Sequence, residues 1–327
     1  MSKVRIGIIG CGSISGSHAE GFAAIPESAE VVACCDIVAD SAGAIAARAG
    51  GSPAIYTDWK KMLAEAAVDA VDICLPHHLH CPAILDAAAA GKHILCEKPL
   101  CRTLDEADEI ARAVAKAGVT YMASHNQLFH PCLTAAREVL DSGRLGRRFW
   151  LRTQDCFVLN RSAEQMGWRA DLDSQGGGEL IDTGYHPTYM LLYLADSPIR
   201  RIASVVSNLR LDYLRADDTA AVSVLFENGA IGQILTSWAM PVPSGNAQIH
   251  AICSDGQLWG TRSDLWIQPA DAEQPEHRQF ERTNTIHAAV AHFVDCVRNG
   301  REPIATLASA REVLELILKA QSDGQGD

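Results

Sequence analysis

The stretch VRIGIIGCGSIS, residues 4–15, constrains the fold of this chain more than any other. A short run rich in β-branched residues ends in Gly10 and Gly12, and the residues that follow have helical spacing. A strand, a glycine turn and a helix in this order let the backbone approach a pyrophosphate at the helix N-terminus. Ser15, the third position of the glycine pattern, is small enough for close packing of helix on strand. The stretch therefore predicts a dinucleotide-binding turn that includes Ser13 and Ile14.

A second strand-like run, EVVACCD, ends at Asp36, 24 residues after Gly12. A carboxylate at this spacing accepts hydrogen bonds from the ribose 2′-hydroxyl and repels a 2′-phosphate. The next residues, Ile37 and Val38, offer no cation for such a phosphate. We therefore predict NAD rather than NADP as the cofactor. The alternative interpretation is a structural turn beside a solvated aspartate.

Strand and helix patterns alternate through the first 120 residues or so, which predicts a parallel sheet with helices on both faces. After about residue 145 the pattern changes to long strands with hairpin signals at Asn228-Gly229 and Asp255-Gly256, followed by two amphipathic helices. We predict an α/β protein with a Rossmann-type NAD(P)-binding domain at 1–123. An α+β domain at 124–327 would contain a large antiparallel sheet, and its C-terminal helices could pack back on the first domain.

Composition excludes several classes of function. Across 327 residues, 40 acidic side chains exceed 28 basic ones and give a net charge of −12, so nucleic acid is a poor candidate partner. No stretch approaches the ~20 apolar residues of a membrane span, and no charged and apolar leader precedes the first strand. The 11 cysteines include no Cys-x-x-Cys pair, which favours reduced thiols. We expect a cytoplasmic location.

The segment CLPHHLHCP, residues 74–82, resembles a metal site because imidazole and thiolate are the ligands that zinc prefers. His77, His78, His80 and Cys81 are the candidate ligands. A tetrahedral site draws its ligand pairs from two separate elements, and nothing elsewhere in the sequence offers a matching pair. We therefore predict no metal, and interpret the segment as a strand-to-helix loop at the cofactor edge.

Two further segments carry acid and base groups. CEKP ends a predicted strand of the parallel sheet, so Lys98 is expected at the ligand edge of that sheet. In GGGELIDTGYHPTYMLLYLA, Asp182 and His186 stand four residues apart, which places them on one face of a predicted helix. A carboxylate one turn from an imidazole raises its basicity, as a general base requires. A surface lysine and a helix-surface ion pair are the alternatives.

Together these segments resemble the Gfo/Idh/MocA oxidoreductase family, the glucose–fructose oxidoreductase and inositol dehydrogenase group. The resemblance is carried by GIIGCGSIS, VDICLPHHLH, GKHILCEKPL, GWRADLDSQGGGELIDTGYH and FVDCVRNGREP, in the family's order. It implies NAD(P)-dependent oxidation of a secondary alcohol on a sugar, cyclitol or related polyol, or the reverse reduction. It also implies that the second domain has an open sheet and that the protein forms homodimers or homotetramers.

The resemblance assigns roles to individual residues. Lys98 would bond the reacting oxygen and share in proton transfer, His186 would be the general base, and Asp182 would orient the histidine or contact a neighbouring hydroxyl. Which of Lys98 and His186 finally holds the proton stays open. The implied cofactor contacts beyond the glycine turn and Asp36 are Pro76, His77, His80, Glu97, Lys98 and Asn126. The implied substrate contacts are Trp168, Arg169 and Tyr189.

The sequence departs from the family pattern at two positions near the expected substrate. Tyr189 stands three residues after the motif histidine, where members often carry an acidic residue, and Leu128 stands where many relatives have arginine. These changes predict a less charged, more aromatic wall and leave the substrate open. There are two competing hypotheses, a metal-dependent enzyme and a non-catalytic regulatory protein on the same fold. Retention of Lys98, Asp182 and His186 argues against the regulatory protein.

Overall fold

The computed structural model describes residues 2–243 and 247–324, and the chain divides into two compact units. Unit 1 contains residues 1–126 and 284–311, and unit 2 contains residues 127–283 and 312–327. The first division lies three residues after the predicted boundary at 123, but residues 284–311 return to unit 1.

Unit 1 is built on a parallel sheet of six strands with the order β3-β2-β1-β4-β5-β6, which confirms the predicted Rossmann-type sheet. Its strands are β1 (Val4–Ile9), β2 (Ala29–Cys35), β3 (Ala54–Tyr56), β4 (Ala70–Ile73), β5 (His93–Cys96) and β6 (Tyr121–Ala123). The order reverses direction between β1 and β4, and ligands of such sheets bind beyond the carboxyl ends of the strands at this reversal.

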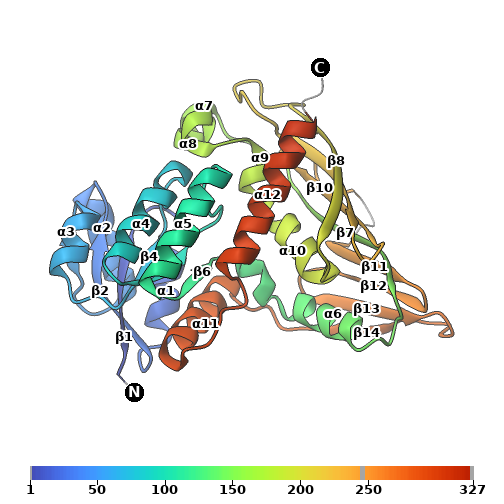
Figure 1. Cartoon of the computed structure of the whole chain (residues 1–327), viewed down its shortest axis with the longest axis horizontal. Helices are drawn as coiled ribbons and strands as arrows, with labels where there is room; N and C mark the ends of the chain where they lie inside the picture. The colour runs from blue at the N-terminus through green and yellow to red at the C-terminus, as the bar shows by residue number, and fades with distance from the viewer. Residues whose placement is uncertain (1, 244–246, 325–327) are drawn as a thin grey trace. The chain divides into compact units, whose positions relative to one another are not determined.

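Helices cover both faces of this sheet (Figure 1). They are α1 (Ser15–Ala23), α2 (Ala39–Ala49), α3 (Trp59–Glu65), η1 (His77–Leu79), α4 (His80–Ala89), α5 (Leu104–Ala117), η2 (Asn126–Phe129) at the unit boundary, and α11 (Thr285–Asn299). From β1 the chain first runs outward to β2 and β3, and then returns past β1 and runs outward in the opposite direction through β4, β5 and β6. Because crossovers are right-handed, the helices of the first direction, α1 and α2, lie on one face of the sheet, and those of the second, α3, α4 and α5, lie on the other. Helix α11 packs against α1, so a segment from near the C-terminus completes the first layer.

Local signals explain where these helices begin and end. The side chain of Thr103 accepts a hydrogen bond from the backbone N–H of Glu106 and fixes the start of α5. Gly118 ends that helix in the left-handed conformation, with φ of 65°.

Unit 2 is built on an eight-stranded sheet with the order β14-β13-β12-β11-β7-β10-β9-β8. Its strands are β7 (Arg148–Cys156), β8 (Ile199–Ser207), β9 (Thr219–Phe226), β10 (Ile231–Ser237), β11 (Ile249–Cys253), β12 (Gly256–Gly260), β13 (Asp264–Pro269) and β14 (Glu276–Gln279). The predicted hairpins occur at β9–β10 and β11–β12, and the sheet is antiparallel except where β7 and β10 pair in parallel.

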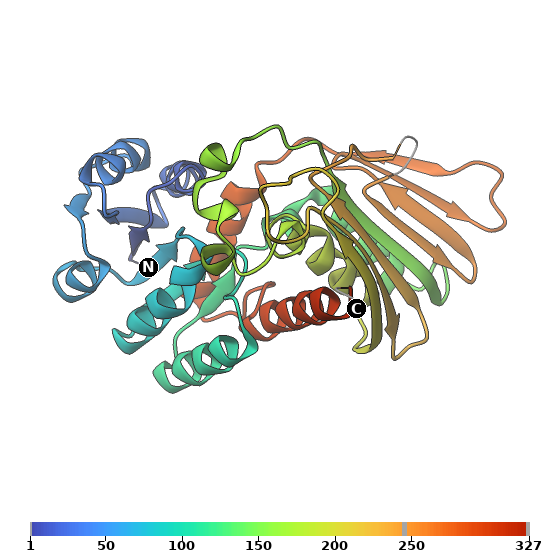
Figure 2. The same ribbon diagram turned by 90° about the horizontal axis from the view of Figure 1, so that it is seen from above.

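The two faces of this sheet differ. Figure 2 shows the strands as one curved layer, with α10 (Tyr185–Ala195) against one side. Leu258 and Leu265 are buried, and α6 (Pro131–Asp141) packs on their strands. Since neighbouring side chains alternate between faces, Trp259 and Trp266 point to the opposite side, where they are half-buried. The remaining helices of unit 2 are α7 (Ala163–Met166), η3 (Gly167–Ala170), α8 (Leu172–Gln175) and α9 (Glu179–Asp182); α12 (Leu307–Gly324) runs from unit 1 into unit 2.

Two global features bear on the class of protein. Within residues 2–243 and 247–324, no helix combines the length and the apolar character needed to cross a lipid bilayer. Each of the 11 cysteines is buried and none of them forms a disulfide.

Candidate active site

The glycine turn after β1 has the backbone geometry that a bound dinucleotide requires. Gly10 has φ of +90°, and a Cβ atom added there would lie 2.5 Å from the carbonyl oxygen of Cys74. A Cβ atom added at Gly12 would meet nothing within 4 Å. Gly10 is therefore required by the packing of the protein itself, whereas Gly12 borders open space beside the start of α1.

The other predicted turn residues lie at the N-terminus of α1. Ser13 and Ile14 are exposed, and the Ser15 hydroxyl is buried and donates to the carbonyl oxygen of Gly12 at 2.7 Å. Unsatisfied N–H groups and the helix dipole make such a terminus favourable for an anion. The residues present therefore fit the pyrophosphate of a dinucleotide.

Asp36 is held against the glycine turn. Its Oδ2 accepts the backbone N–H of Cys11 at 2.8 Å, and its Oδ1 accepts the backbone N–H of Val38 at 2.9 Å. Both bonds fix the carboxylate at the carboxyl end of β2. Ile37 follows it and is 87% exposed, so the side chain next to the carboxylate is apolar and open to solvent.

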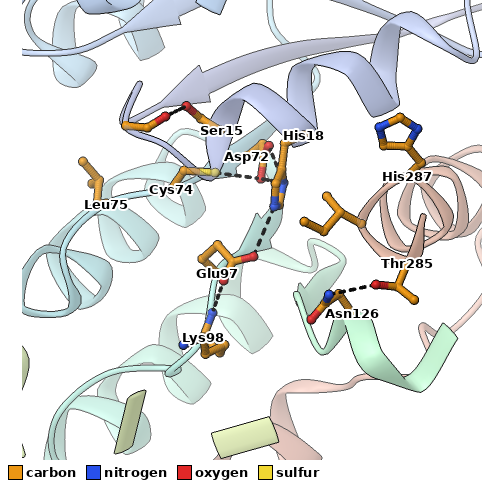
Figure 3. A network of polar contacts seen from close by, with 12 residues as sticks. Ser15, His18, Asp72, Cys74, Leu75, Glu97, Lys98, Asn126, Thr285 and His287 are labelled. Carbon is orange, nitrogen blue, oxygen red and sulfur yellow. Dashed lines mark hydrogen bonds and ion pairs between the residues drawn. The ribbon is translucent and has the colours of Figure 1, made fainter. Parts of the chain in front are cut away.

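Lys98 lies directly after β5, at the carboxyl edge of the parallel sheet, and its peptide bond to Pro99 is cis. Its backbone N–H donates to Oε2 of Glu97 at 3.2 Å. Oε1 of Glu97 lies 3.1 Å from Nε2 of His18, which is fully buried (Figure 3). Glu97, predicted to bind cofactor, thus contacts both α1 and the backbone of the lysine.

The histidine loop after β4 supports the same edge. His80 is fully buried, with Nδ1 2.6 Å from the carbonyl oxygen of Pro99 and Nε2 2.9 Å from that of Leu75. Burial lowers the pKa of His80, and the hydrogen bonds to these two carbonyl oxygens partly oppose that shift. His77 is also buried, and Pro76 stands immediately before the short helix η1. The His80 ring therefore joins the loop after β4 to the turn after Lys98.

Within the described residues, one group of side chains could offer three metal ligands: His18, Asp72 and Cys74, whose ligand atoms lie within 4.8 Å of one another. Only Cys74 comes from the histidine-rich segment. Burial raises the pKa of its thiol to about 12, so the sulfur is not a thiolate. The two nitrogens of His18 face Asp72 and Glu97, and hydrogen bonds within the protein therefore account for this cluster.

Asn126, another predicted cofactor contact, lies at the end of unit 1. Its amide nitrogen donates to the hydroxyl of Thr285 at 2.9 Å, which joins the segment after β6 to the first residue of α11 (Figure 3).

In unit 2, the structure corrects the prediction that Asp182 and His186 share one helix. Asp182 is the last residue of α9, and α10 begins at Tyr185. Pro187 lacks the N–H that a continuous helix would donate to the carbonyl of Thr183, and its ring crowds that carbonyl, so the helix breaks. The spacing of four therefore does not mean one helical turn here.

Asp182 is buried and forms an ion pair with a predicted substrate residue. Nε of Arg169 donates to its Oδ2 at 2.8 Å, and the Arg169 guanidinium lies 4.3 Å from the centre of the Trp168 ring. The structure thus brings together three of the predicted residues of this unit.

His186 is held by Tyr189. Nδ1 of His186 lies 2.7 Å from the Tyr189 hydroxyl, and the backbone N–H of Gln127 donates to that hydroxyl at 3.1 Å. Tyr189 is only 2% exposed. Tyr189 therefore supports the imidazole, and the substrate contact that the sequence predicted for it stays a prediction.

Two buried acidic residues, one in each unit, were not among the predicted site residues. Asp72 is an ionisable residue in the middle of the otherwise apolar run AVDICL, which was a usable signal. Glu179 precedes the Asp182 segment and is fully buried, and burial raises its pKa well above the usual value. The hydroxyl oxygen of Thr236 lies 2.5 Å from Oε1 of Glu179 and 3.1 Å from the carbonyl oxygen of Asp155.

Comparison with known proteins identifies both halves of the chain. Residues 4–125 match the model of the GFO/IDH/MocA oxidoreductase family, NAD-binding Rossmann fold, and residues 133–259 match the GFO/IDH/MocA C-terminal domain.

Curated relatives and solved structures agree with these matches. The chain is 26% identical to a scyllo-inositol 2-dehydrogenase (NAD(+)) of Bacillus subtilis (strain 168) over 97% of this chain and 93% of the relative. It is 27% identical to a 1,5-anhydro-D-fructose reductase of Ensifer adhaerens over 92% and 90%. A levoglucosan dehydrogenase solved with NADH and levoglucosan superimposes with a TM-score of 0.90 at 21% identity, covering 99% of this chain and 98% of the other. This last likeness shows a common fold.

Proposed function

Because the chain belongs to the GFO/IDH/MocA oxidoreductase family with an NAD-binding Rossmann fold, we propose that it transfers a hydride between NAD and a secondary alcohol or ketone of a sugar, cyclitol or related polyol. The observation that carries this proposal is the arrangement of unit 1. There the glycine turn, Asp36 and Lys98 lie at the carboxyl ends of β1, β2 and β5 of one parallel sheet. The named relatives act on sugars and cyclitols, which supports the substrate class.

The residues around the glycine turn would hold NAD, which supplies the hydride acceptor when bound. Gly12 leaves room for the pyrophosphate, the start of α1 attracts its charge, and the fixed carboxylate of Asp36 would accept ribose hydroxyls. Bonds from both backbone N–H groups keep this carboxylate in place before the cofactor arrives.

Lys98 and His186 would handle the proton. In the oxidative direction the hydroxyl O–H bond of the substrate breaks, its proton passes to one of these side chains, and the carbon gives up its hydrogen as hydride and becomes a carbonyl. Tyr189 holds Nδ1 of His186, so the imidazole would meet the substrate through Nε2. Asp182, paired with Arg169, would contact a neighbouring hydroxyl of the substrate.

Substitution of Lys98 by Met tests the assignment. A panel of sugars, inositols and sugar acids, scored by NADH absorbance, first identifies a substrate of the wild-type protein. We expect Lys98→Met to abolish NADH formation while NADH binding stays measurable by fluorescence. Lys116→Met, at an exposed position in the last turn of α5, removes the same charge and should leave turnover unchanged. Turnover by the Lys98→Met variant would refute the catalytic role of the lysine.

The regulatory alternative makes the opposite prediction, that the panel yields ligands but no turnover. The relatives named above are a dehydrogenase and a reductase, and they give this alternative no support. The buried, reduced cysteines support a cytoplasmic location.

We also propose a homodimer or homotetramer assembled through the open face of the unit 2 sheet. An aromatic row crosses five strands of this face: Trp150, His250, Trp259, Trp266 and His277. Trp259 and Trp266 stack with ring centres 6.2 Å apart, and Trp266 stacks on His277 at 4.8 Å. Half-buried aromatic residues are typical of the core of protein interfaces.

Light scattering after size exclusion tests this assembly. A charge placed in the row by Trp259→Glu should convert the oligomer to monomers. Ile55→Glu, at an exposed position of β3 in unit 1, adds the same charge elsewhere and should leave the oligomer intact. A monomeric wild-type protein would overturn the proposal.

A further inference from the structure

A fully buried imidazole joins three elements of unit 1. His18 lies on α1 with no exposed surface, and its Nδ1 is 2.9 Å from Oδ2 of Asp72, which is also fully buried. Its Nε2 is 3.1 Å from Oε1 of Glu97. Figure 3 shows the ring between the two carboxylates, with Lys98 on the far side of Glu97.

The hydrogen bonds require a charged ring. An ionised carboxylate only accepts hydrogen bonds, so a ring bonded to one carboxylate at each nitrogen must carry a proton on both. Burial alone would lower the pKa of His18, but the charge of Asp72 and the hydrogen bonds outweigh it and raise the pKa well above its usual value. Burial alone would raise the pKa of Glu97, but the hydrogen bond and charge of His18, with the charge of Lys98, lower it to about 2.

These contacts link two segments at the carboxyl edge of the sheet, the glycine turn and the turn that contains Lys98. Helix α1 begins at the glycine turn, Asp72 belongs to β4, and Glu97 directly follows β5. The second oxygen of Glu97 accepts the backbone N–H of Lys98. Through these bonds, the helix that begins at the glycine turn is connected to the backbone of the proposed catalytic lysine.

We propose that His18 is a positioning residue, whose imidazolium holds Glu97 and thereby fixes the backbone of Lys98 relative to the glycine turn. This inference rests on the proposed function, because it assigns His18 a part in that reaction. The ring is buried and acts through Glu97, so it touches neither substrate nor cofactor. A residue that only stabilised the core would lower the melting temperature without changing turnover by the folded enzyme.

A double-mutant cycle separates these possibilities. His18→Asn and Glu97→Gln each remove one charge of the network, and we expect each to lower kcat by about ten- to a hundredfold, the scale of a 1 Å misplacement. KM for the polyol should stay within about threefold of the wild-type value in both variants. Kd for NADH should do so in His18→Asn, whereas Glu97 is itself a predicted cofactor contact. The double variant should be no slower than the slower single variant, since both substitutions interrupt one connection.

His93→Asn provides the matched control. His93 is half-buried in unit 1 and accepts the backbone N–H of Thr120 at 3.0 Å, away from the Lys98 turn. We expect this variant to lose thermal stability while kcat changes by less than about twofold. If folded His18→Asn behaves in the same way, the positioning role is refuted.

Nuclear magnetic resonance gives a readout that needs no turnover. In the wild-type protein, ¹⁵N signals of one histidine, absent from His18→Asn, should show both ring nitrogens protonated from about pH 6 to 8. The backbone amide signal of Lys98 should move in His18→Asn and stay in place in His93→Asn. A neutral His18 ring, or an unmoved Lys98 amide, would overturn the inference even if no polyol proves to be a substrate.

If His18→Asn fails to fold, the same measurements on Glu97→Gln test the positioning role, because glutamine keeps the volume of the side chain and removes its charge. A wild-type protein that shows the charged ring but oxidises no member of the panel would refute the proposed function and leave the network itself confirmed.

Discussion

Removal of the Asp36 charge should weaken the preference for NAD over NADP. The carboxylate is fixed by the N–H groups of Cys11 and Val38, and the next side chain, Ile37, is apolar and 87% exposed. No cation therefore follows Asp36 in this turn to offset its repulsion of a 2′-phosphate. Asp36→Asn keeps the size of the side chain and one acceptor oxygen.

Coulomb's law gives the size of the effect. Two unit charges about 4 Å apart interact by ~1 kcal/mol in water and by ~4 kcal/mol at a protein surface. Loss of this repulsion favours NADPH by about five- to a thousandfold relative to NADH. Asparagine has one acceptor oxygen, so one of the two hydrogen bonds from backbone N–H groups is also lost. The cost in stability is only about 1 kcal/mol, because the exposed N–H of Val38 can bond to water instead.

Fluorescence titration with NADH and NADPH checks this prediction. We expect the ratio of the two dissociation constants, NADPH to NADH, to fall at least about fivefold in Asp36→Asn. Asp40→Asn removes the same charge from an exposed position in the first turn of α2 and should leave the ratio unchanged. A ratio that stays within about twofold in Asp36→Asn, or that moves equally in Asp40→Asn, would refute the electrostatic explanation.

Four further outcomes are expected. Gly10→Ala should lower both the melting temperature and the affinity for NADH. Gly12→Ala should lower only the affinity, because its methyl group enters the open space proposed for the pyrophosphate and contacts no protein atom. Equal losses of stability in the two variants would contradict this. The stability of Glu179→Gln relative to wild type should increase as the pH rises above 4.5. Burial raises the pKa of Glu179 in the folded protein, so above this pH the unfolded wild-type chain releases the proton and is favoured over the folded state. Denaturation series at about pH 5 and 8 test the sign. Tyr189→Phe should lower kcat by about tenfold, with little change in KM, by releasing the His186 ring. Metal analysis of purified, tag-free protein should find no stoichiometric zinc, and a near-stoichiometric amount would revive the metal-dependent alternative.

Several features of the fold follow from short stretches of sequence. The glycine turn after β1, the capped start of α5 at Thr103 and the hairpin at Asn228-Gly229 each depend on residues close in the chain. Backbone conformation and local hydrogen bonds decide such features, so spacing alone predicts them. Spacing gives the wrong helix for Asp182 and His186, because Pro187, the third residue of α10, breaks the helix between them.

Other features depend on contacts between distant segments. The parallel pairing of β7 with β10 and the return of α11 to unit 1 follow from which apolar faces can be buried together. Spacing within a segment does not record that choice.

The His18 network shows most clearly which features depend on local sequence and which depend on contacts between distant segments. The sequence by itself determined that a strand, a glycine turn and a helix would present a dinucleotide site, and that Lys98 would end a strand of the same sheet. His18 lies 54 residues from Asp72 and 79 from Glu97, so only the tertiary structure could bring them together. Burial removes water from His18 and Asp72 and most of the water from Glu97, and each charge then requires a protein partner that the folded sheet supplies.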